Sequence, residues 1–217
     1  MIVLGLTGSI GMGKSTAAGM FRRMGIPVCD SDAIVHRLLA KGGAAVGPIG
    51  RAFDGVVRDG AVDRSALGRQ VFGDPEALRK LEAIVHPLVH ASQARFLRVT
   101  MRRREAIVVL DVPLLFEGGT DRCCDATVVV TAPRFLQEQR VLSRPGMTRE
   151  RLVGTLARQM PDAEKRHRAD FVVQTGIGRR HTLKRLADIV TLMKVRRGTK
   201  WPAASPERWA GHARSRT

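Results

Sequence analysis

A glycine-rich segment near the amino terminus constrains this chain more than any other feature. It reads Gly-Ser-Ile-Gly-Met-Gly-Lys-Ser from Gly8 to Ser15. An apolar run at Ile2–Thr7 precedes the segment, and a helical pattern follows it from Lys14 to Met24. The sequence therefore predicts a buried strand, a tight loop and a helix in direct succession.

This succession suits the binding of a chain of phosphate groups. Glycines allow successive backbone N–H groups to turn toward phosphate oxygens, and the N-terminus of the following helix adds a favourable dipole. The Lys14 ammonium can reach the β- and γ-phosphates, and the Ser15 hydroxyl can bind Mg²⁺. We therefore predict that the chain binds a nucleoside triphosphate together with Mg²⁺. The residues expected to bind the nucleotide here are Gly8, Gly11, Met12, Gly13, Lys14, Ser15 and Thr16.

Short apolar runs separated by helical stretches predict a five-stranded parallel sheet covered on both faces, an α/β fold of the P-loop NTPase and nucleotide-kinase type. The expected strands are Ile2–Thr7, Pro27–Cys29, Ile107–Leu110, Ala126–Val130 and Phe171–Val173. The expected helices are Lys14–Met24, Ala33–Ala40, Asp63–Phe72, Pro75–Ala83, Leu88–Arg102, Arg134–Leu142, Arg149–Gln159 and His181–Val195. The interval between the second and third strands is too long for one crossover, so residues 33–104 are expected to form a helical insert. The domain is expected to span residues 1–198, with a mobile basic tail at 199–217.

Charge and composition narrow the choice of partner and compartment. The chain has 37 Lys and Arg against 20 Asp and Glu, a formal charge of +17 that would suit a nucleic-acid partner. However, the basic residues are spread along the chain, and only 4% of residues are aromatic, which leaves few side chains for stacking on bases. No apolar run approaches the roughly 20 residues of a membrane span. The three cysteines match neither a disulfide framework nor a zinc site, so we expect a cytoplasmic protein.

Among proteins with a phosphate loop, the small kinases fit best. A GTPase would carry a guanine-reading Asn-Lys-x-Asp after a late strand, where this chain reads Thr-Ala-Pro-Arg at 131–134. An ABC or AAA ATPase would be longer, with a strand ending in consecutive acidic residues. A small kinase accounts for a helical insert that holds an acceptor and for an arginine-rich lid.

Two pairs of charged residues are candidates for kinase chemistry. Asp30 and Asp32 follow the second strand, at the edge of the sheet where the phosphate loop also lies. Either carboxylate could accept a proton from an acceptor hydroxyl or help to hold the metal, and either could instead cap a helix. Arg140 and Arg144 lie four residues apart on one expected helical face, where two guanidinium groups could clamp a phosphoryl group or form a solvated surface pair.

Together these segments resemble the dephospho-coenzyme A kinase family over residues 4–190. The markers are the phosphate loop, Asp30-Ser-Asp32, His86-Pro87, Asp111-Val-Pro-Leu-Leu-Phe-Glu117, Gln139-Arg140, Arg144, Gln159, Lys165 and Ala169-Asp170. Many activities share the phosphate loop alone, whereas the later segments in this order are more specific.

The resemblance implies phosphorylation by ATP of the ribose 3′-hydroxyl of dephospho-coenzyme A, the last step of coenzyme A biosynthesis. It implies that Lys14 and Arg140 stabilise the phosphoryl group in transit, that Asp32 is the base, and that Arg144 binds the nucleotide. It also implies that Asp32, His86, Leu115 and Glu117 contact the acceptor, and that a lid at residues 140–165 closes over the site. From the residues alone, His86 could equally satisfy a turn, and Leu115 could equally belong to the core.

Three positions depart from the family pattern. Ser31 stands where the family often has Ala. His36 stands where Arg is frequent in the family, so the function of that arginine passes to Arg37 or is lost. After the last strand, where the family usually shows Asn within an Asn-x-Gly turn, this chain reads Gln174-Thr175-Gly176-Ile177, and the departure at Thr175 puts a contact with the nucleotide base there in doubt. Two other functions remain open: a kinase for a nucleoside monophosphate or a shikimate-like acceptor, and a basic nucleic-acid binder.

Overall fold

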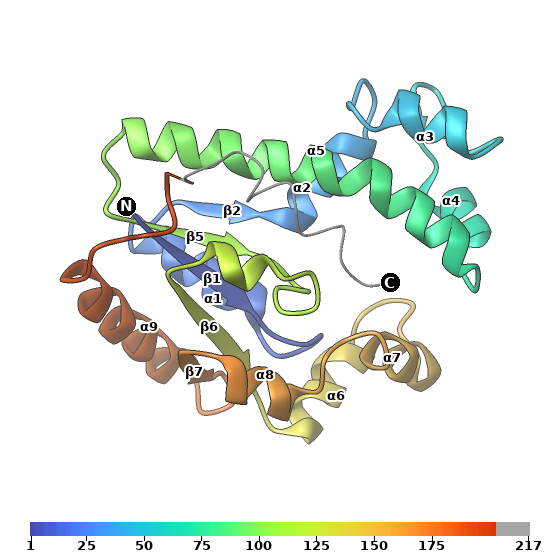
Figure 1. Ribbon diagram of the computed structural model, residues 1–217. Helices are drawn as coiled ribbons and strands as arrows, with labels where there is room; N and C mark the ends of the chain where they lie inside the picture. Colours follow the sequence, from blue (N-terminus) through green and yellow to red (C-terminus); the bar gives the residue numbers. More distant parts are fainter. Residues whose placement is uncertain (203–217) are drawn as a thin grey trace.

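The computed structural model describes residues 1–202 of the chain and contains the expected five-stranded parallel sheet. The strand order is β2-β5-β1-β6-β7, and every pair of neighbours in this sheet is parallel. The strands are β1 (Ile2–Thr7), β2 (Val28–Asp30), β5 (Ile107–Asp111), β6 (Ala126–Thr131) and β7 (Phe171–Gln174). Since β1 lies in the middle, the loop after it emerges between the ends of β5 and β6 (Figure 1).

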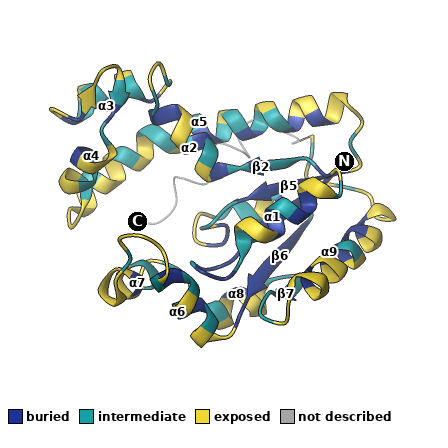
Figure 2. Cartoon of the chain, turned by 180° about the vertical axis from the view of Figure 1, so that it is seen from behind, coloured by how far each residue is buried: buried dark blue, intermediate teal, exposed yellow. Residues whose placement is uncertain are grey.

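Alternate residues of the central strands enter two separate cores. Leu4 and Leu6 pack on one face against α1 (Lys14–Arg23) and α9 (Arg179–Lys194). Val3 points to the other face, where the helices of the insert cover the sheet. A parallel sheet covered on both faces needs strands that are apolar throughout, and these strands are buried along almost their whole length (Figure 2).

The segment between β2 and β5 is mostly helical, as expected. It consists of α2 (Ser31–Leu39), α3 (Val46–Ala52), the short hairpin β3 (Val57–Arg58) and β4 (Ala61–Val62), α4 (Arg64–Val71) and α5 (Pro75–Arg102). The hairpin and α3 were not expected from the sequence, because both are short and carry weak hydrophobic periodicity.

One expectation for the insert is wrong. The helices expected at Pro75–Ala83 and Leu88–Arg102 form one helix of 28 residues, α5, with Pro87 inside it. Proline in a helix interior removes one backbone hydrogen bond and favours a break. Here Asp74 caps the first turn, and four later side chains, including Gln93 and Leu97, are buried, so tertiary packing keeps the helix continuous past Pro87.

The second half of the chain completes the sheet and adds helices beside its carboxyl edge. A 3-10 turn at Thr120–Cys123 precedes β6, and α6 (Arg134–Leu142), α7 (Arg149–Leu156) and α8 (Asp162–Arg168) lie between β6 and β7. Figure 1 shows α7 and the α3–α4 part of the insert projecting from the same end of the sheet. Helix α8 is an element that we did not expect.

The start of the expected tail is part of the folded domain. Thr199 and Lys200 donate backbone hydrogen bonds to the Asp125 carboxylate at 2.6 and 3.1 Å. The same carboxylate accepts the backbone N–H of Val3 at 2.8 Å, so it links residues 199 and 200 to β1. The rest of the expected tail, 203–217, lies outside the described residues. Within residues 1–202, no helix is long and apolar enough to cross a membrane.

Candidate active site

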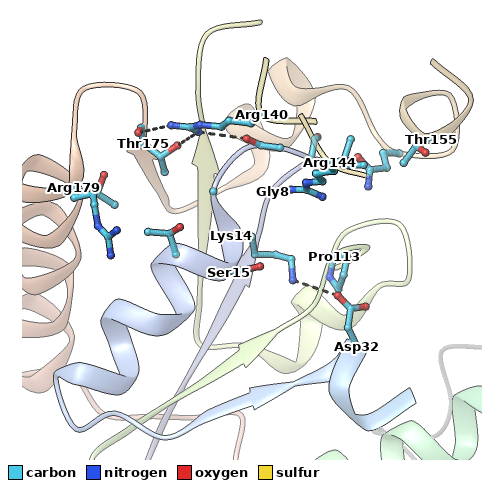
Figure 3. A pocket seen from close by; sticks show the side chains of 17 residues that line it. Gly8, Lys14, Ser15, Asp32, Pro113, Arg140, Arg144, Thr155, Thr175 and Arg179 are labelled. Carbon is cyan, nitrogen blue, oxygen red and sulfur yellow. Dashed lines mark hydrogen bonds and ion pairs between the residues drawn. The ribbon is translucent and has the colours of Figure 1, made fainter. Parts of the chain in front are cut away.

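A cavity of about 630 Å³ lies at the carboxyl ends of the strands. This is the position at which open parallel sheets bind their ligands. Its walls come from the phosphate loop, from the first turns of α1 and α2, from α6 and α7, and from the end of β7 (Figure 3). The lining side chains that the sequence analysis had singled out are Lys14, Ser15, Thr16, Asp32, Arg140, Arg144, Gln159 and Thr175.

The phosphate loop requires glycine at particular positions. Gly11 has a φ of 78° and Gly13 a φ of 89°, values in the left-handed region that glycine adopts without strain. A Cβ on Gly11 would also lie 2.6 Å from a methyl group of Val141. Gly13 precedes α1, and no side chain of the described residues caps that helix. The first backbone N–H groups of α1 are therefore left for an anion, as phosphate binding requires.

Two glutamine side chains hold the middle of this loop. Gln159 accepts the backbone N–H of Ile10 at 3.1 Å, and Gln137 donates to the Ile10 carbonyl at 2.7 Å. Gln137 lies on α6 and Gln159 lies just after α7. The phosphate loop is therefore tied directly to the segment that we expected to be the lid. Sequence reasoning had noted Gln159 only as part of a family pattern.

Lys14 lies between two carboxylates. Its Nζ is 2.6 Å from Oδ1 of Asp111, whose side chain is 3% exposed, and 3.7 Å from Oδ2 of Asp32, whose side chain is 72% exposed. Burial raises the pKa of the Asp111 carboxyl, and the positive charge of Lys14 acts against that rise. Sequence reasoning did not list Asp111 as a site residue. The available signal was its place at the end of a buried strand next to β1, which brings it beside the phosphate loop.

The structure separates the roles of Asp30 and Asp32. Asp30 is the N-cap of α2, and its Oδ1 accepts the backbone N–H of Ala33 at 3.0 Å. Its Oδ2 lies 3.6 Å from the Arg22 guanidinium. Asp32 lies in the first turn of the same helix, and its side chain points toward Lys14 and the cavity (Figure 3). The helix-cap interpretation therefore applies to Asp30, and the Asp32 carboxylate is free to face a ligand.

Both candidate arginines line the cavity, although their environments differ. Arg140 is half-buried and donates to the hydroxyl and the carbonyl of Thr175 at 3.0 and 3.1 Å. Arg144 is exposed. Figure 3 shows Arg140 directed toward Thr175, while Arg144 lies over the opening of the phosphate loop. The Arg140 guanidinium is therefore held by hydrogen bonds, whereas Arg144 is exposed.

Three residues expected to contact the acceptor are not in the cavity wall. Leu115 is fully buried in the core beneath the insert, so the core interpretation is the correct one. The Glu117 carboxylate binds the Lys165 ammonium at 2.9 Å and the Met160 backbone N–H at 2.8 Å. His86 is exposed on the continuous helix α5, so the expected turn at this residue is absent.

The fold and the site define a kinase with a phosphate loop that acts on a small molecule. A profile of the dephospho-CoA kinase family matches residues 2–178. This chain belongs to the dephospho-CoA kinase family.

Individual relatives agree with that assignment. A dephospho-CoA kinase of Paramagnetospirillum magneticum is 64% identical over 166 residues, which cover 76% of this chain and 78% of the relative. One of Mesorhizobium japonicum is 52% identical over 199 residues, which cover 92% of this chain and 100% of the relative. Among solved structures, TT1252 from Thermus thermophilus superposes with a TM-score of 0.77 at 39% identity, covering 90% of this chain and 98% of that one.

Proposed function

We propose that this site transfers the γ-phosphoryl group of ATP to the ribose 3′-hydroxyl of dephospho-coenzyme A, giving coenzyme A and ADP. The observation that carries the proposal is the position of Lys14, whose ammonium lies between the buried Asp111 and the exposed Asp32. A phosphate-binding cation and a free carboxylate thus meet at one cavity wall. Transfer to a hydroxyl requires a group that positions the phosphates beside a group that accepts the hydroxyl proton.

Asp32 is the base in this proposal. Its carboxylate accepts the proton of the ribose hydroxyl as the oxygen attacks the γ-phosphorus, and the bond from that phosphorus to ADP breaks on the opposite side. The first turn of α2, capped by Asp30, fixes the backbone that carries Asp32. An exposed carboxylate suits this role because an acceptor can reach it from the cavity.

The cations neutralise the charge of the phosphates. Asp111 holds the Lys14 ammonium at the end of the phosphate loop, so this cation is in place before the nucleotide binds. Arg140, half-buried beside the loop, would stabilise the phosphoryl group in transit, and Arg144, exposed at the cavity, would bind the nucleotide. Guanidinium groups suit this task because they bind phosphate oxygens in pairs.

The residues beside the loop also fit a magnesium ion. Mg²⁺ in kinase sites binds one or two protein oxygens along with substrate phosphates and waters, so it needs no cluster of carboxylates. Ser15 lines the cavity with an exposed hydroxyl, and Asp32 and the buried Asp111 lie at the same wall. Ser15 and Asp111 would hold the ion, which when bound would neutralise phosphate charge, while Asp32 remains available as the base.

The cellular compartment in which the enzyme works is part of the same proposal. Within residues 1–202, none of the cysteines forms a disulfide. Cysteines without disulfides are typical of proteins that work in a reducing compartment, so we place the enzyme in the cytoplasm.

An acceptor panel tests the proposed reaction. ADP release is measured with dephospho-coenzyme A, AMP, CMP and shikimate at equal concentrations, with buffer as the blank. We expect dephospho-coenzyme A to give the highest turnover by a wide margin. If it released no more ADP than buffer while another acceptor did, the assignment of the acceptor would be wrong.

A further inference from the structure

The hydroxyl of Thr175 connects three parts of the active site. Its Oγ1 lies 2.8 Å from the Met12 carbonyl in the phosphate loop and 3.0 Å from Nη1 of Arg140. A hydroxyl has one proton and two lone pairs, and an arginine can only donate. Thr175 therefore donates to Met12 while it accepts from Arg140. Thr175 directly follows β7, and its backbone N–H donates to the Thr131 carbonyl at 2.8 Å.

Thr175 also packs on the phosphate loop through its carbon atoms. A Cβ placed on Gly13 would lie 3.2 Å from both Cβ and Cγ2 of Thr175, so the threonine fills the space that this glycine leaves free. The side chain thus covers the last loop residue before α1. Figure 3 shows Thr175 and Arg140 facing one another above the loop.

The second arginine nitrogen completes the arrangement. Nη2 of Arg140 donates to the Thr175 carbonyl at 3.1 Å, and Nη1 approaches the Gly11 carbonyl at 3.4 Å. Arg140 is therefore oriented by one residue through two atoms, with a weaker contact to the loop. Arg144, four residues further along the chain, also lines the cavity and is exposed.

We propose that Thr175 is a positioning residue that sets the Arg140 guanidinium against the phosphate loop. This inference rests on the proposed function, because it gives Arg140 the role of stabilising the nucleotide phosphates. Thr175 acts through Arg140 and through Met12, and it need not touch the substrate. The Thr175 hydroxyl thus serves the phosphate loop and the arginine together.

Variants of Thr175, with Arg140→Met alone and combined with the valine in what we call the third variant, separate the hydroxyl from the shape of the side chain. Thr175→Val keeps the shape and removes the hydroxyl, and Thr175→Ser keeps the hydroxyl and removes the methyl group. We expect kcat of Thr175→Val to fall roughly tenfold to a hundredfold, the range for losing a hydrogen bond to a charged group. Thr175→Ser should recover most of that loss. In the third variant, Arg140→Met combined with Thr175→Val, the valine should lower kcat no further than Arg140→Met does alone.

A matched control measures what the loss of a buried hydroxyl does by itself. Thr127 lies at the start of β6, and its hydroxyl bonds the Asp170 carboxylate at 2.8 Å. Thr127→Val should lower the melting temperature while leaving kcat and the KM for ATP close to those of the parent enzyme.

The outcomes distinguish the two proposals. If the parent enzyme released no ADP with dephospho-coenzyme A, the proposed function would fail whatever the variants did. If the parent were active and Thr175→Val turned over as fast, the positioning role of Thr175 alone would be refuted. That role would also be refuted if the losses from Thr175→Val and Arg140→Met simply multiplied, because independent losses show that Thr175 does not act through Arg140.

Discussion

Two carboxylates that are separated by one residue have different tasks in this protein. Asp30 uses its side chain to cap α2, and Asp32 leaves its own side chain free beside Lys14. Because a helix cap needs only an acceptor oxygen, Asn can replace Asp as a cap. A general base needs a carboxylate, so the same replacement at Asp32 removes its function.

Asp32→Asn should therefore lower kcat by about 10²–10⁴, the usual contribution of a general base, with little change in the KM for ATP. Steady-state kinetics with dephospho-coenzyme A give both values. Asp30→Asn is the matched control and should keep turnover and melting temperature near those of the parent. Near-normal turnover of Asp32→Asn would remove this residue from the catalytic machinery.

The thiol of Cys29 adds a pH dependence to stability. Burial in β2 raises its pKa from 9.0 to about 12. A raised pKa means that the unfolded chain loses this proton first, so the stability from the protonated thiol is complete below pH 9.0 and declines toward about 12. The free energy of unfolding should fall more steeply with pH in that window for the parent than for Cys29→Ala, by about 1.4 kcal/mol per pH unit. Equal slopes in urea titrations would contradict this.

At the scale of elements, a buried ion pair joins the loop after β5 to α8. Lys165 is fully buried, and its ammonium binds Glu117 at 2.9 Å and the Pro113 carbonyl at 3.3 Å. Pro113 lines the cavity and also accepts the Thr7 hydroxyl at 2.9 Å. The ion pair therefore supports Pro113 in the cavity wall. This role differs from the acceptor contact expected for Glu117.

Glu117→Gln should destabilise the protein by about 3 kcal/mol, because it leaves the Lys165 ammonium buried without a counter-charge. Thermal and urea unfolding measure the loss. The double variant Glu117→Leu with Lys165→Met removes both charges and should recover most of the stability. A Glu117→Gln protein as stable as the parent, with a raised KM for the acceptor, would favour the original acceptor-binding role.

At the scale of the whole molecule, the insert contacts the segment that we expected to be the lid. Helices α4 and α7 project from one end of the sheet (Figure 1). The guanidinium of Arg158, just after α7, lies 5.1 Å from the centre of the Phe72 ring, just after α4. Phe72 is 75% exposed. Two segments far apart in the chain, one in the insert and one just after α7, thus meet.

Phe72→Ala should weaken this contact and raise the KM for dephospho-coenzyme A by roughly twofold to fivefold, the value of an exposed cation–π pair. kcat should change less, because neither residue lines the phosphate loop. Phe135→Ala removes another exposed ring, on α6, and serves as the control. An unchanged KM in Phe72→Ala would show that the contact does not contribute to acceptor binding.

The sheet and the phosphate loop could be predicted because their signals are local. Six buried residues in β1 and the glycine spacing after them determine a strand, a loop and the start of α1 without help from distant residues. The order of motifs likewise identified the family. The break expected at Pro87 failed because packing along α5 outweighs the propensity of one residue.

Contacts between residues far apart in the chain could not be predicted from the sequence. Asp111 meets Lys14 from 97 residues away, and Thr175 meets Met12 from 163 residues away. Both pairings depend on the strand order, which places β5 and β6 beside β1 and β7 beside β6. The ion pair of Glu117 could not be foreseen for the same reason, since nothing near Glu117 in the chain indicates Lys165 as its partner.

The central claim is that the phosphoryl group is transferred to the ribose 3′-hydroxyl of dephospho-coenzyme A. The most direct test is phosphorus NMR and mass spectrometry of the product formed from ATP and dephospho-coenzyme A. We predict a product heavier by one phosphoryl group, with a new phosphomonoester signal coupled to the 3′ proton of the ribose, in an amount equal to the ADP released. ADP without a phosphorylated product, or a phosphate on another oxygen, would contradict the account.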